Sequence, residues 1–126
     1  MISTTQYSSK RNSANILCSL NALRFNPRFS DVTLLVAQVR IPAQRFVLAA
    51  FSDYFRAMFE WSELSESFET EIRLEDLDAE AVERVVNFCY SSAIEISEEN
   101  VESMLEIACF LQVEEVKGQG CHHFFF

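Results

Sequence analysis

One run, "PAQRFVLAAFSDYFRAMF" from Pro42 to Phe59, constrains the fold more than any other stretch. Most of its residues are Phe, Val, Leu and Ala, so most of the run must be buried. It nevertheless carries the charged Arg45 near its start. Because burying an unpaired charge is costly, Arg45 needs either a nearby carboxylate or a position at an edge of the core.

The apolar pattern predicts three helices in the first half of the chain. "SANILCSLNALRF" has an apolar stripe that indicates an amphipathic helix with Asn12 or Ser13 as its N-cap, formed by Ile16, Leu17, Leu20 and Leu23. "AQRFVLAAF" is apolar on nearly all faces after Gln44 and Arg45, which indicates a helix buried on all sides. "DYFRAMF" follows as a short helix, with a cap at Ser52 or Asp53.

Short strands are predicted in three places. Asp31 to Ile41 is rich in Val, Leu and Ile and indicates two strands that turn at Ala37-Gln38 and end before Pro42. Glu71–Leu74 predicts another short strand, and Ala93–Ile96 alternates with period two and is a further candidate.

Two more helices are predicted in the second half. Asp78 is the expected cap of "AEAVERVVNFCY", and Ser97 that of "EENVESMLEIACFLQ". Each carries a helical apolar stripe: Val82, Val85, Val86 and Cys89 in the first, and Val101, Met104, Leu105, Ala108 and Cys109 in the second. Helices outnumber the three or four strands, so the fold class is α/β or α+β.

Composition indicates one globular domain in residues 14–126, preceded by a polar segment in residues 1–13. The chain has 126 residues, of which 49% are hydrophobic, enough for a core. No apolar stretch is long enough to span a membrane, and the polar start is not a signal peptide, so we expect a cytoplasmic or nuclear protein. The four cysteines are expected to be reduced core residues: Cys18, Cys89, Cys109 and Cys121.

Charge argues against nucleic acid or a membrane surface as a partner, because the net charge is −9. The charge is uneven: residues 1–59 carry seven basic and two acidic side chains, whereas residues 60–115 carry two basic and seventeen acidic ones. The acidic half is either an ordinary solvated surface or a surface that steers a basic partner.

No catalytic constellation or cofactor motif is present. Only two Gly occur, so a glycine-rich phosphate loop is excluded. Cys121, His122 and His123 could bind a metal, but adjacent His side chains diverge on a helix and no second ligand pair accompanies them. We therefore expect no enzyme activity, no metal, no cofactor and no small-molecule substrate.

Five stretches follow one another along the chain: "LNALRFNPRFSDVTLLV", "IPAQRFVLAAFSDYFRAMF", "EIRLEDL", "VNFCYSSAIEISEENVESMLEIACFLQVEEV" and "CHHFF". Together, from about Ala14 to Phe125, they closely resemble the BTB/POZ domain, in particular that of kelch-like proteins. The resemblance implies a cluster of helices flanked by a short three- to four-stranded sheet. It also implies a homodimer.

The resemblance places the dimer interface on the first helix and on the helix that follows Arg45. The interface residues would be Ile16, Leu17, Leu20, Leu23, Phe46, Ala49 and Ala50. The stripe of the first helix agrees with this, although it could also pack within one chain. The resemblance further implies a charged pocket in which Asp31 and Arg45 pair. Gln44 stands where the family usually has His, so this position cannot titrate.

The resemblance to kelch-like proteins implies binding to the amino-terminal domain of cullin-3, as part of a substrate adaptor of a ubiquitin ligase. The contact motif, a hydrophobic residue, any residue and then Glu, is matched by Leu64-Ser65-Glu66. Tyr54 and Tyr90 are aromatic candidates for the same contact, or else core residues. The segment from Phe59 to Leu64 is one residue longer than usual.

Other functions remain open at this point. The chain ends at "CHHFFF", where kelch-like proteins continue into a BACK domain and a kelch propeller, so we expect a fragment, a short isoform or a dimerisation module. The alternatives are a transcription-type BTB domain that recruits corepressor peptides and a plain oligomerisation module.

Overall fold

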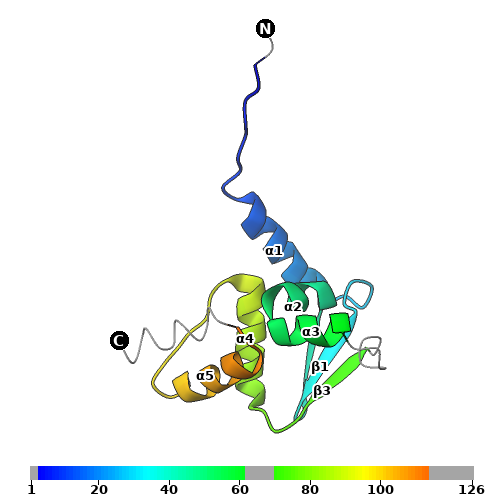
Figure 1. Ribbon diagram of the computed structural model, residues 1–126, viewed down its shortest axis with the longest axis vertical. Helices are drawn as coiled ribbons and strands as arrows, with labels where there is room; N and C mark the ends of the chain where they lie inside the picture. The colour runs from blue at the N-terminus through cyan, green and yellow to red at the C-terminus, as the bar shows by residue number, and fades with distance from the viewer. Residues whose placement is uncertain (1–2, 62–69, 114–126) are drawn as a thin grey trace.

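The computed structural model describes residues 3–61 and 70–113, and it confirms the expected α+β class (Figure 1). Within these two ranges, five helices cluster beside a small mixed sheet. In chain order the elements are α1 (Asn12–Leu23), β1 (Val32–Val36), β2 (Val39–Ala43), α2 (Arg45–Phe51), α3 (Asp53–Trp61), β3 (Glu71–Leu74), α4 (Ala79–Ser91) and α5 (Val101–Phe110).

The sheet has the strand order β2-β1-β3, with β1 in the centre. β1 runs antiparallel to β2, with Val36 opposite Val39, and parallel to β3, with Leu34 opposite Ile72. The predicted turn is confirmed: Ala37 takes a left-handed conformation with φ of 54°, which Gly or Asn usually adopts. The predicted end of the second strand is wrong. β2 includes Pro42, which an edge strand tolerates because one side of it needs no ladder hydrogen bonds.

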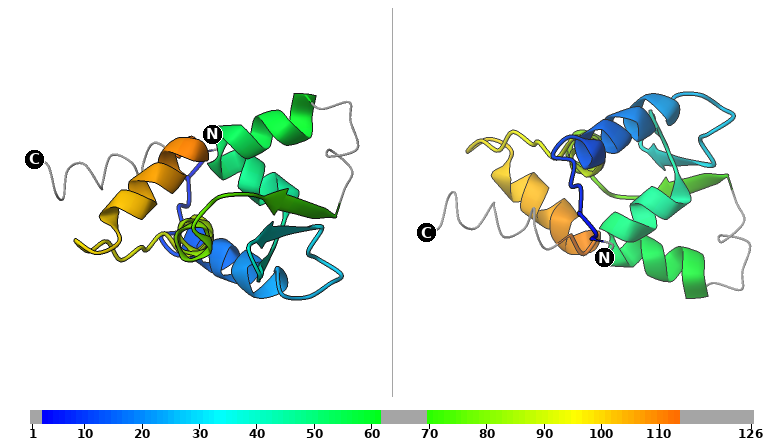
Figure 2. Two further views of the ribbon diagram at one scale, coloured as in Figure 1. Left: turned by 90° about the horizontal axis from the view of Figure 1, so that it is seen from below. Right: turned by 90° about the horizontal axis from the view of Figure 1, so that it is seen from above.

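A single core joins the sheet to the helices. The inward side chains of β1 are buried, and they pack in one cluster with apolar residues of α4 and α5. Figure 2 shows α4 end-on between the sheet and α5. The most deeply buried members of this cluster include Leu34, Val36, Val82, Val85 and Ala108. The period-two and helical stripes of the sequence therefore face each other, as expected from amphipathic elements.

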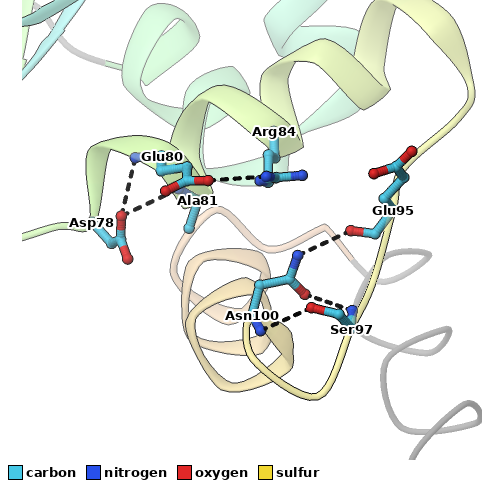
Figure 3. Close-up of polar contacts among 7 residues, drawn as sticks. All are labelled: Asp78, Glu80, Ala81, Arg84, Glu95, Ser97 and Asn100. Carbon is cyan, nitrogen blue, oxygen red and sulfur yellow. Dashed lines mark hydrogen bonds and ion pairs between the residues drawn. The ribbon is translucent and has the colours of Figure 1, made fainter.

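The predicted N-terminal caps are correct for α3 and α4 and wrong for α1. Asp78 caps α4 as expected, because its carboxylate accepts from the backbone N–H groups of Glu80 and Ala81 (Figure 3). Ser52 caps α3 through a 3.2 Å bond from the Phe55 N–H. The prediction for α1 is wrong: the hydroxyl of Ser9 accepts from the first N–H groups, and neither Asn12 nor Ser13 is the N-cap.

The last described helix, α5, begins later than predicted. Residues 98–100 form a turn, and the helix starts at Val101. Ser97 and Asn100 bond reciprocally: the Asn100 side chain accepts from the Ser97 N–H at 2.9 Å, and the Ser97 hydroxyl accepts from the Asn100 N–H (Figure 3). This local pairing gives the backbone an alternative to a helical turn.

Two further expectations about buried segments are wrong. α2 is not buried on all sides, because only Val47 and Leu48 are buried and Phe46 is 64% exposed. Ala93–Ile96 is not a strand in the structure. Its period-two pattern arises because Ile94 and Ile96 pack partly against the core.

The cysteines differ from one another in burial. Cys89 is buried as expected, but Cys18 and Cys109 are exposed, so the prediction that they are core residues is wrong. Cys121 lies outside the described residues.

Within residues 3–61 and 70–113, no helix is both long and apolar enough to cross a membrane.

Candidate functional site

Helix α1 presents an apolar stripe that the rest of the described chain covers only in part. None of its 12 residues is buried. Ile16 is 54% exposed, and Leu17, Leu20 and Leu23 are only half-buried. In Figure 1 the first turns of α1 project away from the other elements. A stripe of this kind on a stable helix is typical of an interaction surface.

A groove between α1 and α2 continues this apolar surface. It has a volume of about 360 Å³ and is lined by Leu17, Leu20, Phe46, Val47, Ala50, Phe51 and Cys89. A second hollow of about 300 Å³ lies along α1 and is lined by Asn15, Ile16, Ser19, Leu20 and Leu23. We call these two hollows the apolar groove. The groove contains six of the seven predicted interface residues; Ala49 is half-buried and does not line it.

Asp31 and Arg45 do meet, but in a different way from the predicted side-chain pair. The carboxylate of Asp31 accepts a 2.7 Å hydrogen bond from the backbone N–H of Arg45, the first residue of α2. The guanidinium carbon of Arg45 lies 5.5 Å from the centroid of the Phe59 ring, within cation-π range. Arg45 is half-buried, at the edge of the core. Because the Asp31 carboxylate accepts from the first N–H of α2, Asp31 acts as a cap for this helix.

Replacing Asp31 by Ala is expected to lower the free energy of unfolding by about 1 kcal/mol, the usual effect of losing a capping side chain. Asp31→Asn keeps an oxygen that can accept the Arg45 N–H, so it should retain most of the stability. Urea denaturation of the two variants makes the comparison. Equal losses in both variants would show that the charge of Asp31, rather than its capping bond, stabilises the domain.

Tyr90 and Gln44 form a buried polar pair beside the apolar groove. The Tyr90 hydroxyl donates to Gln44 Oε1 at 2.5 Å and accepts from the Gln44 backbone N–H at 3.0 Å. Gln44 Nε2 donates to the carbonyl of Leu20 on α1. Burial raises the pKa of Tyr90 to about 12. Tyr90 is only 1% exposed, which favours the alternative of core packing over the predicted contact with a partner.

Cys89 shares this buried environment. Burial raises the pKa of its thiol to about 12, so it stays protonated at neutral pH. A thiol of this kind behaves as a small apolar residue and is a poor nucleophile.

The predicted cullin contact is only partly described. Tyr54 is half-buried, and its ring centroid lies 4.8 Å from that of Phe110, which is 42% exposed. Leu64 and Glu66 lie outside the described residues, as do Cys121, His122 and His123. Within the part of the chain that the structure describes, no group of His, Cys, Asp or Glu could hold a metal ion.

Sequence reasoning missed two residues of this region, Phe110 and Arg24. Arg24 is only 4% exposed although it is charged. Its spacing gave a signal: Leu17, Leu20 and Arg24 share one helical face, so Arg24 belongs to the buried side of the helix.

Comparisons with known proteins give one consistent result. The family model described as BTB/POZ domain matches residues 20–125. The BTB (Tramtrack and Bric a brac) domain of human gigaxonin is similar with a TM-score of 0.83 and 23% identity, covering 98% of this chain and 100% of that one. The BTB domain of zebrafish PATZ1 is similar with a TM-score of 0.83 and 28% identity, covering 94% and 96%.

Proposed function

Because the chain belongs to the BTB/POZ domain family, a family of protein interaction and dimerisation modules, we propose that it forms a homodimer and binds cullin-3. In this proposal the dimer is part of a substrate adaptor of a cullin-RING ubiquitin ligase and works in the cytoplasm or nucleus. The observation that carries the homodimer is the exposed apolar groove of α1 and α2.

Self-association follows from the chemistry of that groove. Its lining is mostly aliphatic and aromatic, with Asn15, Ser19 and Cys89 as the exceptions. Phe46 and Ile16 are 64% and 54% exposed. Aromatic and aliphatic anchors of this kind supply most of the binding energy at protein interfaces. A second copy offers the same apolar surface, as the self-complementary interface of a twofold dimer requires.

Cullin-3 binding rests on the sequence and on an aromatic surface formed by α3 and α5. Leu64-Ser65-Glu66 follows α3 in the chain and matches the contact motif of kelch-like BTB domains. Leu64 would enter an apolar pocket of the cullin, and Glu66 would accept a charge-assisted hydrogen bond. Tyr54 on α3 and the exposed Phe110 on α5 lie together and add an aromatic surface to which α3 contributes.

Isothermal titration with the amino-terminal domain of cullin-3 tests this partner. We expect a Kd below about 1 μM for the unmodified chain and loss of binding in the Leu64→Ala/Glu66→Ala variant, because both the apolar anchor and its charged neighbour are removed. A matched Glu75→Ala/Glu102→Ala variant removes two exposed carboxylates of the same acidic half. It should bind normally if the motif, rather than overall charge, is recognised.

The alternative functions predict different results in the same experiment. No binding at about 100 μM, together with a dimeric mass, would contradict the cullin proposal. A corepressor-type module would then bind apolar peptides, whereas a plain oligomerisation module would show self-association alone. A monomeric mass at every concentration would contradict the homodimer itself.

A further inference from the structure

Arg24 is a buried cation held by neutral groups from three different elements. Its Nε donates to Asn21 Oδ1 on α1 at 2.9 Å, and its Nη1 donates to the carbonyl of Pro42 on β2 at 3.2 Å. Its Nη2 donates to Asn87 Oδ1 on α4 at 2.6 Å. The ion pairs that the structure shows within residues 3–61 and 70–113 do not include Arg24.

Two aromatic rings complete this environment. The guanidinium carbon lies 4.7 Å from the ring centroid of Phe25 and 4.5 Å from that of Tyr90. Burial lowers the pKa of Arg24, but arginine remains protonated in proteins. The charge is therefore stabilised by oriented dipoles and ring faces, an arrangement that depends on each of them being in place.

The place of Arg24 in the chain makes these contacts important for α1. Arg24 is the C-cap of that helix, and the helix buries none of its own residues. Two further contacts of α1 lie close by in its last turns: Leu20 packs against the core, and its carbonyl accepts from Gln44. The first turns, which carry Ile16, project away from the domain (Figure 1).

We infer that Arg24 is a positioning residue that fixes the angle of α1 against α4 and β2, so that the apolar groove has the shape needed for dimerisation. This inference rests on the proposed homodimer. A helix attached at one end is oriented by the geometry of that attachment. The guanidinium provides donors in fixed directions to two other elements, which an apolar contact alone cannot provide.

The test compares Arg24→Met with Arg28→Met, a matched loss of an exposed arginine four residues away. Hydrogen exchange, measured at a concentration where the chain is monomeric, reports the attachment of α1. We expect amides of α1 to exchange at least about tenfold faster in Arg24→Met, while amides of β1 keep their protection. Sedimentation equilibrium should then show a dimer Kd raised by about tenfold or more, with no change in Arg28→Met.

A second variant covers the case in which Arg24→Met does not fold. Asn87 is exposed, so Asn87→Ala removes the acceptor on α4 without emptying the core, and it should accelerate exchange in α1 by a smaller factor. Faster exchange throughout the domain, or unchanged exchange in α1, would overturn the inference. If the unmodified chain never dimerises, the proposed function fails, while the exchange data still decide whether Arg24 holds α1.

Discussion

The Ile16→Asp/Phe46→Asp variant is expected to be monomeric at concentrations where the unmodified chain is a dimer, with the dimer Kd raised by roughly hundredfold or more. Both side chains are more than half exposed in the single chain, so the two carboxylates remain hydrated there and the fold is retained. In the dimer, the same carboxylates would have to enter an apolar groove without partners, which is strongly unfavourable.

Sedimentation equilibrium over a range of concentrations measures this effect. Phe29→Asp is the matched control, because Phe29 is 51% exposed but does not line the apolar groove. The control should dimerise like the unmodified chain. An unchanged dimer in the Ile16→Asp/Phe46→Asp variant would place the dimer interface on another surface.

Tyr90→Phe should lower the free energy of unfolding by about 2 to 4 kcal/mol, although it removes a single oxygen atom. That oxygen both accepts from the Gln44 N–H and donates to the Gln44 side chain, and Gln44 is 2% exposed. Its loss leaves a buried donor and a buried acceptor of Gln44 without this partner, and water cannot easily replace it.

Urea denaturation followed by circular dichroism measures this loss. Tyr7→Phe is the control, because Tyr7 is 88% exposed and its hydroxyl is hydrated in both states. The Phe ring of the Tyr90→Phe variant still lies under Arg24, so hydrogen exchange in α1 should change less than it does in Arg24→Met. A loss below about 0.5 kcal/mol would show that Gln44 finds another partner.

Much of the fold could be predicted from local patterns. The stripe of Val82, Val85, Val86 and Cys89 identified the buried face of α4, because a helix that packs on one side must repeat its apolar residues every three or four positions. Asp78 and Ser52 could be found as caps because their side chains bond only two or three residues ahead. Information of this kind is contained in short segments.

The errors come from features that depend on distant neighbours. Phe46 and the buried Val47 are adjacent and both apolar, and only the packing of α2 decides which of them is covered. Ile94 and Ile96 alternate like a strand, but a strand also needs a partner with free hydrogen-bonding groups. Asp31 and Arg45 were expected to pair through their charged side chains, but Asp31 contacts the backbone N–H of Arg45, which depends on where α2 begins.

The parallel pairing of β1 with β3 has a consequence for how the chain folds as it is synthesised. β1 and β2 are joined by a two-residue turn and can pair as soon as both have formed. β3 pairs with β1 only after α2, α3 and the following segment have been made, so one edge of β1 stays open during that interval. The central strand of the finished sheet is therefore an edge strand in the nascent chain, when it is most exposed to pairing with the wrong neighbour.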